Sequence, residues 1–165
     1  MEKIFLEKPA EAKKEKRFLE KQLKVKISFE NKFAVIEGEP VNEYEAIMVF
    51  EAINLGFSAR TASLITDENF IFEKINMKDY TKRKNLDVVR GRMIGTHGKT
   101  KKTIEQISGS KIKIKDNTVA IIGPAESISN SITAITNIIR GSKQANMYRY
   151  LERINTEKRK RNFYR

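Results

Sequence analysis

Two stretches of the chain share one alternation of apolar and polar residues. Residues 24–36 and 111–122 each begin as an alternating strand, pass through a short polar turn and end in a strand that is apolar on both faces. The polar turns fall at residues 30–32 and 115–117. Each stretch therefore predicts a β-hairpin.

A helical pattern follows each hairpin after a glycine. The first helix is expected over residues 42–55, where Asn42 and Glu45 have the spacing of a capping box. The second is expected over residues 125–140, with isoleucines recurring every three or four residues on one side. Each pattern stops at a residue typical of a helix C-terminus. These two residues are Gly56 and Gly141.

The pattern before each hairpin also recurs, as a basic helical segment over residues 10–23 and again over residues 99–108. A spacing of about 85 residues indicates two copies of one strand, helix, strand, strand, helix unit. Between the copies, Ser58 is expected to cap a short helix that ends near Ile65, and residues 70–75 alternate like a strand. The predicted fold class is α+β, with two small sheets that are each covered on one face by helices.

Composition narrows the chemistry. The chain has 165 residues, of which 39% are hydrophobic, enough for one ordinary domain or two very small ones. The absence of cysteine and the single His97 exclude a disulfide framework and a zinc cluster that needs two histidines. The longest apolar run, residues 46–50, is far shorter than the roughly 20 residues of a membrane span. We therefore expect a soluble, cytoplasmic protein without a metal or another cofactor.

The net charge of +12 is unevenly distributed. Residues 1–80 carry a net charge of −2, and residues 81–165 carry +14. A field of this kind favours a polyanionic partner, of which nucleic acid is the commonest. Residues 158–165 add five basic and two aromatic side chains, a composition typical of tails that stay disordered until they meet a phosphate backbone.

The most informative segment is residues 90–109. A helix predicted over residues 86–94 stops at Gly95, and a second helix begins near Lys99. A joint of four residues requires backbone angles that glycine tolerates best, and it presents amide donors where the helix dipole favours an anion. Without side chains at Gly95 and Gly98, a sugar-phosphate backbone can approach closely.

Two simpler interpretations of this joint fit less well. Gly98-Lys99-Thr100 resembles the end of a P-loop, but that motif needs a glycine where Met93 stands and a buried strand where a helix is predicted. A plain helix–helix turn would not explain the basic residues on both sides of the joint.

Isoleucines at positions 94, 104, 107, 112 and 114, with glycines at 95, 98 and 109, complete the pattern. The segment resembles a KH domain, a module for single-stranded nucleic acid whose GxxG loop clamps about four nucleotides. The predicted order of elements is that of the type I, eukaryotic-type KH fold. Residues 90–95, 98–101, 119–123 and 148–153 are similar to archaeal KH-domain ribosomal RNA-processing proteins, relatives of the small-subunit assembly factor called partner of Nob one or Dim two.

This resemblance implies a non-enzymatic RNA-binding factor of ribosome biogenesis. It implies that the chain holds the 3′ region of 16S ribosomal RNA, near the sites of a PIN-domain endonuclease and a dimethylase. Contact with these two enzymes or with translation initiation factor two is implied as well. The sequence itself places no acid, base and nucleophile together, so catalysis is not expected.

The residues expected to bind RNA surround the loop. Its amides should contact two successive phosphates, with lysines beside them and arginines extending the phosphate track along the first helix. Two isoleucines should form the rim of the groove for bases, and a strand face rich in lysine is either an RNA contact or a solvated surface. The expected RNA-binding residues are Arg90, Arg92, Ile94, Gly95, Thr96, His97, Gly98, Lys99, Lys102, Ile112 and Lys113.

The first copy departs from the pattern, because residues 10–13 read Ala-Glu-Ala-Lys where the alignment of the copies places GxxG. We expect residues 1–66 to form a degenerate KH-like unit without the clamp or the helix before it, and with a linker helix near residues 58–65. A KH domain over residues 67–155 and a basic tail over residues 156–165 would follow.

Two other functions stay open. In one, both units dock on protein, an initiation-factor subunit or the endonuclease, and the chain is an adaptor. In the other, the chain is a messenger-RNA-binding or degradation-complex KH protein, which Lys101 disfavours because common KH domains have an apolar residue there.

Overall fold

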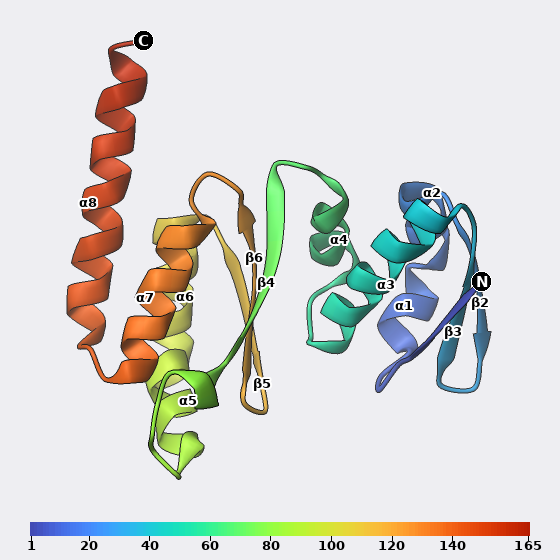
Figure 1. Cartoon of the computed structure of the whole chain (residues 1–165), viewed down its shortest axis with the longest axis horizontal. Helices are drawn as coiled ribbons and strands as arrows, with labels where there is room; N and C mark the ends of the chain where they lie inside the picture. Colours follow the sequence, from blue (N-terminus) through green and yellow to red (C-terminus); the bar gives the residue numbers. More distant parts are fainter. The chain divides into compact units, whose positions relative to one another are not determined.

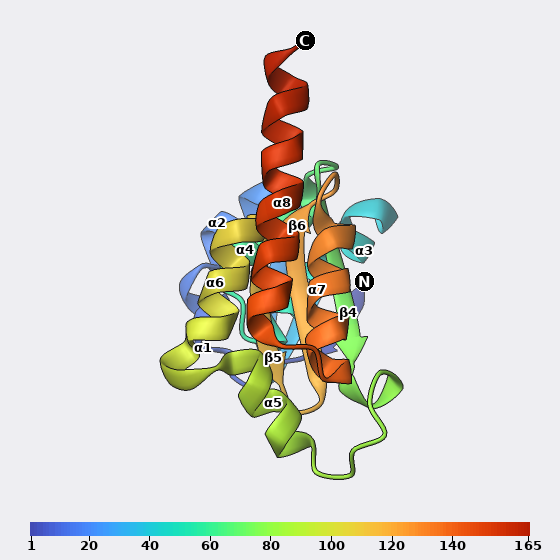
Figure 2. The same cartoon turned by 90° about the vertical axis from the view of Figure 1, so that its left-hand side faces the viewer.

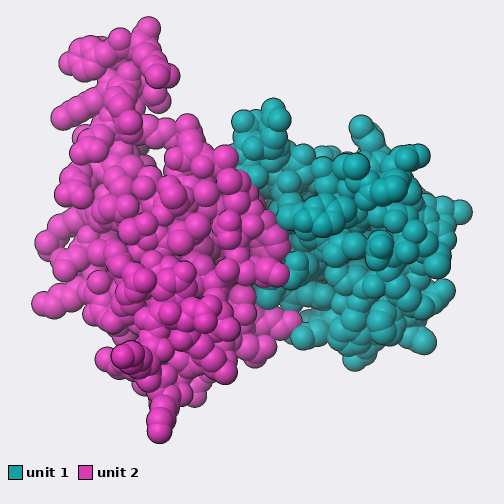
Figure 3. Space-filling model, in the orientation of Figure 1, with its two compact units in different colours: residues 1–70 teal, residues 71–165 magenta.

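The computed structural model describes residues 1–165, which form two compact units (Figure 3). Unit 1 spans residues 1–70 and unit 2 spans residues 71–165, whereas the sequence places the boundary between residues 66 and 67. None of the helices combines the length and the apolar character needed to cross a membrane.

Unit 1 is a three-stranded antiparallel sheet with helices on one face (Figure 1). Its strands, in the spatial order β1-β3-β2, are β1 (Glu2–Phe5), β2 (Lys26–Glu30) and β3 (Phe33–Glu37). Its helices are α1 (Ala10–Lys14), α2 (Lys16–Leu23), α3 (Pro40–Asn54), α4 (Ala59–Ala62) and the 3₁₀ helix η1 (Ser63–Thr66). The α2 helix precedes the β2–β3 hairpin and α3 follows it, as the hydrophobic pattern predicts.

Unit 2 repeats this arrangement with more helices (Figure 2). Its strands, in the order β4-β6-β5, are β4 (Phe70–Asn76), β5 (Lys111–Lys115) and β6 (Thr118–Pro124). Its helices are η2 (Met77–Asp79), α5 (Leu86–Ile94), η3 (Thr96–Gly98), α6 (Lys99–Ser108), α7 (Ile128–Arg140) and α8 (Gln144–Phe163). The predicted α+β class, with two helix-covered sheets, is confirmed.

The core of unit 2 lies between its sheet and its helices. Ile112 of β5 and Ile121 of β6 are paired in register and fully buried, and Ile104 of α6 and Ile135 of α7 cover them. Burial of one such side chain stabilises a fold by about 1.5 to 3 kcal/mol. Because side chains alternate along a strand, the lysines of β5 lie on the opposite face from Ile112.

Two local predictions for unit 1 are wrong. The α3 helix begins at Pro40 with Glu39 as its N-cap, since proline at the first helical position already has the required φ. Asn42 therefore lies inside the helix, and no capping box forms. Its side-chain Nδ2 instead donates to the backbone carbonyl of Lys24 at 3.5 Å. The helical segment predicted over residues 10–23 is also not continuous, because it breaks at Glu15 into α1 and α2, and no helix precedes residue 10.

The residues predicted as a tail form part of a helix. The α8 helix continues to Phe163, because Leu151 is buried in the core and the helix extends from that anchored turn. Basic residues near its C-terminus also interact favourably with the helix dipole.

Candidate nucleic-acid interface

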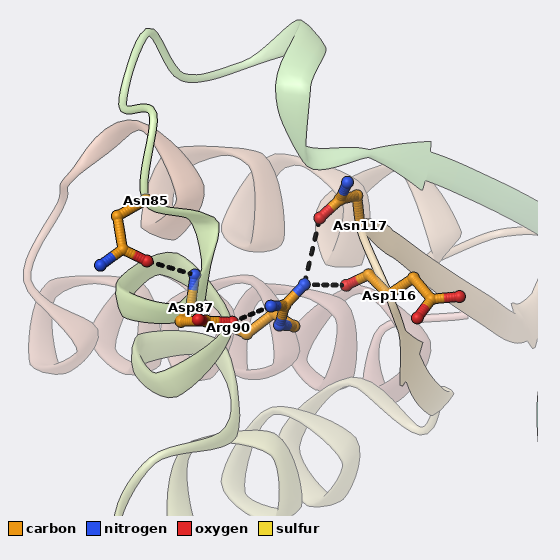
Figure 4. A network of polar contacts seen from close by, with 5 residues as sticks. All are labelled: Asn85, Asp87, Arg90, Asp116 and Asn117. Carbon is orange, nitrogen blue, oxygen red and sulfur yellow. Dashed lines mark hydrogen bonds and ion pairs between the residues drawn. The ribbon is translucent and has the colours of Figure 1, made fainter.

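The α5 helix leads into the predicted clamp, and Arg90 fixes its position (Figure 4). The side-chain oxygen of Asn85 caps the helix by accepting from the Asp87 amide at 3.1 Å. Arg90 pairs with Asp87, and its Nη1 donates to the Asp116 carbonyl at 2.7 Å and to Asn117 Oδ1 at 3.1 Å. Arg90 thereby ties α5 to the β5–β6 turn.

Arg92 fastens the other side of α5. Its Nη1 donates to the Ile138 carbonyl at 3.0 Å and its Nη2 to the Ser142 carbonyl at 2.5 Å, at the C-terminal end of α7. Ile138 lies in the last turn of α7, where its carbonyl also accepts from the Gly141 amide at 3.1 Å, and Ser142 lies just beyond the helix. Both arginines, Arg90 and Arg92, therefore have donors engaged within unit 2. The structure thus shows a positioning role for both arginines, and their expected contact with phosphates stays a prediction.

The joint between α5 and α6 is built from left-handed backbone. Gly95, His97 and Gly98 have φ values of 75°, 54° and 73°. A Cβ atom on Gly95 would lie 2.2 Å from Thr100 Oγ1 and 2.6 Å from the Thr100 amide nitrogen, so no other residue fits. A Cβ atom on Gly98 would meet nothing closer than Lys102 Cε, at 3.8 Å. Packing against Thr100 therefore requires glycine at position 95, and the positive φ favours glycine at position 98.

Only some amides of this loop are available to a ligand. The Gly95 amide donates to the Gly91 carbonyl at 2.8 Å, the Gly98 amide to the Gly95 carbonyl at 3.1 Å, and the Lys99 amide to the Thr96 carbonyl. The amides of Thr96 and His97 precede these turn bonds and, like the first amides of any helix, lack a partner inside the turn. Both residues are exposed. Of the loop amides expected to donate to phosphates, those of Thr96 and His97 are therefore the two that remain available.

Exposed cations flank the loop. Lys99 and Lys102 are exposed, and Lys102 reaches back along Gly98. Lys101 instead pairs with Glu105 at 2.7 Å. Two of the three lysines in the first turns of α6 therefore remain for an anion.

An apolar strip runs along the exposed side of α5. Ile94 is 39% exposed and Val88 is 45% exposed, and between them nothing lies within 4 Å of a Cβ placed on Gly91. Positions three apart on a helix are neighbours, so these residues form one open surface that leads to the loop. The sequence analysis did not select Val88 and Gly91. The signal was available, because positions 88, 91 and 94 lie three residues apart on one side of the predicted helix.

Two expected residues do not join this surface. Ile112 is fully buried, so its assignment to the rim of the groove is wrong. Lys113 is half-buried and lies on the face of β5 opposite to Ile112, away from the helices. The surface is thus made from α5, the loop and α6.

No group of three or more His, Cys, Asp or Glu side chains could hold a metal ion. Every buried side-chain nitrogen or oxygen has a hydrogen-bond partner.

Comparison with known proteins gives matches over unit 2 and over nearly the whole chain. The family model for the second KH domain of PNO1, described as a eukaryotic-type KH domain (KH-domain type I), matches residues 71–156. The KH domain-containing protein MJ0443 of Methanocaldococcus jannaschii is 30% identical over 145 residues, which cover 84% of this chain. The chain spans 64% of the length of that relative.

Two solved structures extend the similarity to both units. Dim2p from Pyrococcus horikoshii superposes with a TM-score of 0.78 and 33% identity, over 92% of this chain and 98% of that chain. A chain of the a/eIF2alpha–aDim2p–rRNA complex from the same organism superposes with a TM-score of 0.79 and 31% identity, over 94% of each chain.

Proposed function

We propose, on the premise that this chain belongs to the PNO1 family of type I KH-domain proteins, that unit 2 clamps single-stranded RNA near the 3′ end of 16S ribosomal RNA. The family is one of RNA-binding ribosome assembly factors, which are not a class of enzymes. The clamp is the loop of residues 95–98, and the chain acts by binding, without catalysis.

The observation that carries this proposal is the left-handed loop between two helices. Its glycine-bounded turn exposes the amides of Thr96 and His97, and Lys99 and Lys102 place positive charge beside them. Successive amides that point outward from such a turn bind anions. Next to them, the apolar strip of Val88, Gly91 and Ile94 offers a surface on which bases can stack.

The similarity to a chain solved in a complex with ribosomal RNA supports ribosomal RNA as the ligand. The net charge of +14 on unit 2 supports a polyanion in general, but it does not select a sequence. We propose that the protein acts in the cytoplasm on pre-ribosomal RNA, beside the PIN-domain endonuclease and the dimethylase that act near that RNA end, or with translation initiation factor two.

The test is a fluorescence titration of the intact protein and its Thr96→Asp/His97→Asp variant, at physiological salt. One RNA carries the 3′-terminal sequence of 16S ribosomal RNA and the other carries the same bases scrambled. Two carboxylates placed against phosphates should weaken binding of the first RNA more than about a hundredfold, because like charges brought together at an interface cost several kcal/mol. The circular dichroism spectrum and the melting temperature should stay unchanged, since both side chains are exposed.

A matched control removes the same exposed side chains without adding charge. The Thr96→Ser/His97→Asn variant keeps both amides, and it should bind as the natural chain does. Equal binding of both RNAs by all three proteins would contradict the clamp and leave only general charge attraction.

Unit 1 favours a second candidate, docking on protein. It carries a net charge of −2, and on α3 it exposes 69% of Val41 and 67% of Tyr44. An adaptor of this kind would bind an initiation-factor subunit or the endonuclease with an affinity that the loop variant does not change.

A further inference from the structure

We infer that the C-terminal end of α8 is a second RNA-binding surface, for the part of the strand that runs beyond the clamp. This inference rests on the proposed function, because it assigns a second contact to the same RNA. Its surface, called here the α8 tip, consists of Lys158, Arg159, Lys160, Arg161, Asn162, Phe163, Tyr164 and Arg165.

The α8 tip extends past the body of unit 2. The helix packs through Leu151, and the Asn155 side chain donates to the Ile107 carbonyl at the end of α6. Beyond that contact, the helix continues for eight residues to Phe163, which corresponds to about 12 Å. Figures 1 and 2 show these last turns standing clear of the other elements of unit 2.

Most of the cations of the α8 tip form no ion pair within the chain. Lys158 pairs with Glu126, while Arg159, Lys160, Arg161 and Arg165 are exposed. Like charges three or four residues apart repel each other and weaken a helix. Within the helix only Lys158 and Arg161 stand at such a spacing, so this repulsion is small. The four cations that form no ion pair remain available to an external polyanion.

The α8 tip also contains a recess and a pair of aromatic rings. Lys158, Arg161, Asn162 and Arg165 line a recess of about 240 Å³ together with Glu126. Phe163 and Tyr164 form an edge-to-face pair with ring centroids 5.6 Å apart, and each is 85% exposed. Exposed aromatic rings beside cations are the combination that binds single-stranded nucleic acid, since bases stack while phosphates are neutralised.

The position of the α8 tip determines which RNA can reach it. The α6 helix starts at the loop and lies beside α8, so the loop and the tip are separated by roughly 25 Å along these helices. A KH loop clamps about four nucleotides. A four-nucleotide RNA at the loop therefore leaves the tip unoccupied, and only a longer strand contacts both.

The experiment measures binding of the intact chain to a four-nucleotide RNA and to a 24-nucleotide RNA that begins with the same four bases. In the charge variant, Lys160→Gln/Arg161→Gln/Arg165→Gln, affinity for the long RNA should fall on the order of tenfold at physiological salt. The slope of log affinity against log salt should shrink by about 2, because each phosphate contact on a single strand contributes about 0.7. Affinity for the short RNA should not change.

A matched control removes three cations from unit 1. Lys21, Lys26 and Lys32 are exposed, so Lys21→Gln/Lys26→Gln/Lys32→Gln lowers the net charge by the same amount. It should leave both RNAs bound as before. An equal loss in the two triple variants would overturn the inference and leave an effect of net charge alone.

The aromatic variant, Phe163→Ala/Tyr164→Ala, provides an independent arm. Loss of stacking should weaken the long RNA on the order of tenfold with little change in the salt slope. Unchanged binding in both tip variants would also overturn the inference, and capture of an acidic protein by the natural tip would then identify the other occupant.

The clamp variant separates this inference from the proposed function. If Thr96→Asp/His97→Asp loses the four-nucleotide RNA while the tip variants bind the long RNA normally, the clamp stands and the second surface fails. If the clamp variant still binds the short RNA, the proposed function fails, and the tip variants still report on the long RNA.

Discussion

Unit 1 and unit 2 arrange three strands in the same order and differ at the joint between the two helices that follow the first strand. In unit 1, α1 and α2 meet at Glu15, whose φ of −98° is ordinary, and the Leu19 amide donates to the Glu15 carbonyl at 2.9 Å. In unit 2, α5 and α6 meet through a loop with three positive φ values. The joint in unit 1 continues the helical hydrogen bonding, whereas the joint in unit 2 leaves the amides of Thr96 and His97 without a partner inside the turn and is open to a ligand.

The difference shows that the fold does not need the clamp. Unit 1 buries Ile27 and Ile36 across its hairpin as unit 2 buries Ile112 and Ile121, without any glycine between its helices. At the α5–α6 joint the two glycines adopt positive φ without steric cost, but the left-handed φ of His97 costs about 1 to 2 kcal/mol that the joint in unit 1 avoids. A feature that the fold can omit, and that costs free energy where it occurs, is best explained by a ligand.

The largest expected effect is that of Gly95→Ala. The new Cβ would overlap Thr100 and would hold alanine at a left-handed φ, so unit 2 should lose about 3 kcal/mol of stability. Chemical denaturation followed by circular dichroism measures this loss. The comparison in unit 1 is Glu15→Ala, which removes an exposed ion pair with Arg60 and should cost less than about 1 kcal/mol. Equal losses would mean that the open joint is not strained.

Gly98→Ala sharpens the same contrast within the loop. Only the backbone angle opposes this change, since the nearest atom is 3.8 Å from the new Cβ, so the loss should be about 1 kcal/mol. A loss as large as that of Gly95→Ala would show that the two glycines are required for the same reason.

Arg92→Ala should cost about 2 kcal/mol of stability, because it leaves the Ile138 and Ser142 carbonyls without their charged donor. In unit 1, α1 is tied by a different side chain, Glu11, whose Oε1 accepts from the Ala59 amide at 3.1 Å. The Arg92 change does not touch that contact, so only unit 2 should unfold more easily. Arg92→Lys should recover part of the loss. If Arg92→Ala leaves the melting temperature unchanged and weakens only RNA binding, Arg92 is a direct RNA contact.

Lys99→Gln/Lys102→Gln should show the opposite pattern. Both side chains are exposed, so stability should change by less than about 0.5 kcal/mol. RNA affinity should fall on the order of tenfold, with the salt slope reduced by about 1.4. Titrations at several salt concentrations measure both quantities. An unchanged slope would remove these lysines from the interface.

The smallest effect concerns Glu43 in unit 1. Its carboxylate accepts from the amino group of Met1 at 3.0 Å and from the Gly38 amide at 2.9 Å, and these contacts lower the pKa of Glu43 below its ordinary value. Because the folded pKa is the lower one, this stabilisation is present above the ordinary pKa and is lost as pH falls through the folded value. In the Glu43→Gln variant, the stability of unit 1 should depend less on pH in this acidic range, while the stability of unit 2 should keep its pH dependence. Unfolding measured at successive pH values checks both.

The fold could be predicted because periodicity reports which side of an element is buried. Hairpins, the α5 and α6 limits and the cap at Ser58 all follow from short-range pattern, and the structure has them. The start of α3 lies two residues before the position that the capping-box spacing predicts, because Pro40 already has the φ that the first helical position requires. The helical state of residues 158–163 depends on an anchor at Leu151, which a local composition rule does not include.

The glycine turn of the candidate site could be predicted from the sequence, whereas the contacts of the residues around it could not. Gly95 and Gly98 indicate the turn because backbone angles are a local property. Apart from Asp87, the partners of Arg90 and Arg92 lie 26 to 50 residues away in the chain, so no local pattern could separate a positioning arginine from a free one. Ile112 is likewise buried by helices distant in sequence, which a strand pattern cannot reveal.

The left-handed angle of His97 has a consequence for the rate of association. Because the loop already has its unusual backbone in the absence of RNA, the free energy of forming it is included in folding and is not repeated at each encounter. Binding then needs no preceding rearrangement, and the rate constant should rise linearly with RNA concentration without reaching a plateau. A loop with this preformed backbone can capture an RNA strand that is exposed only briefly.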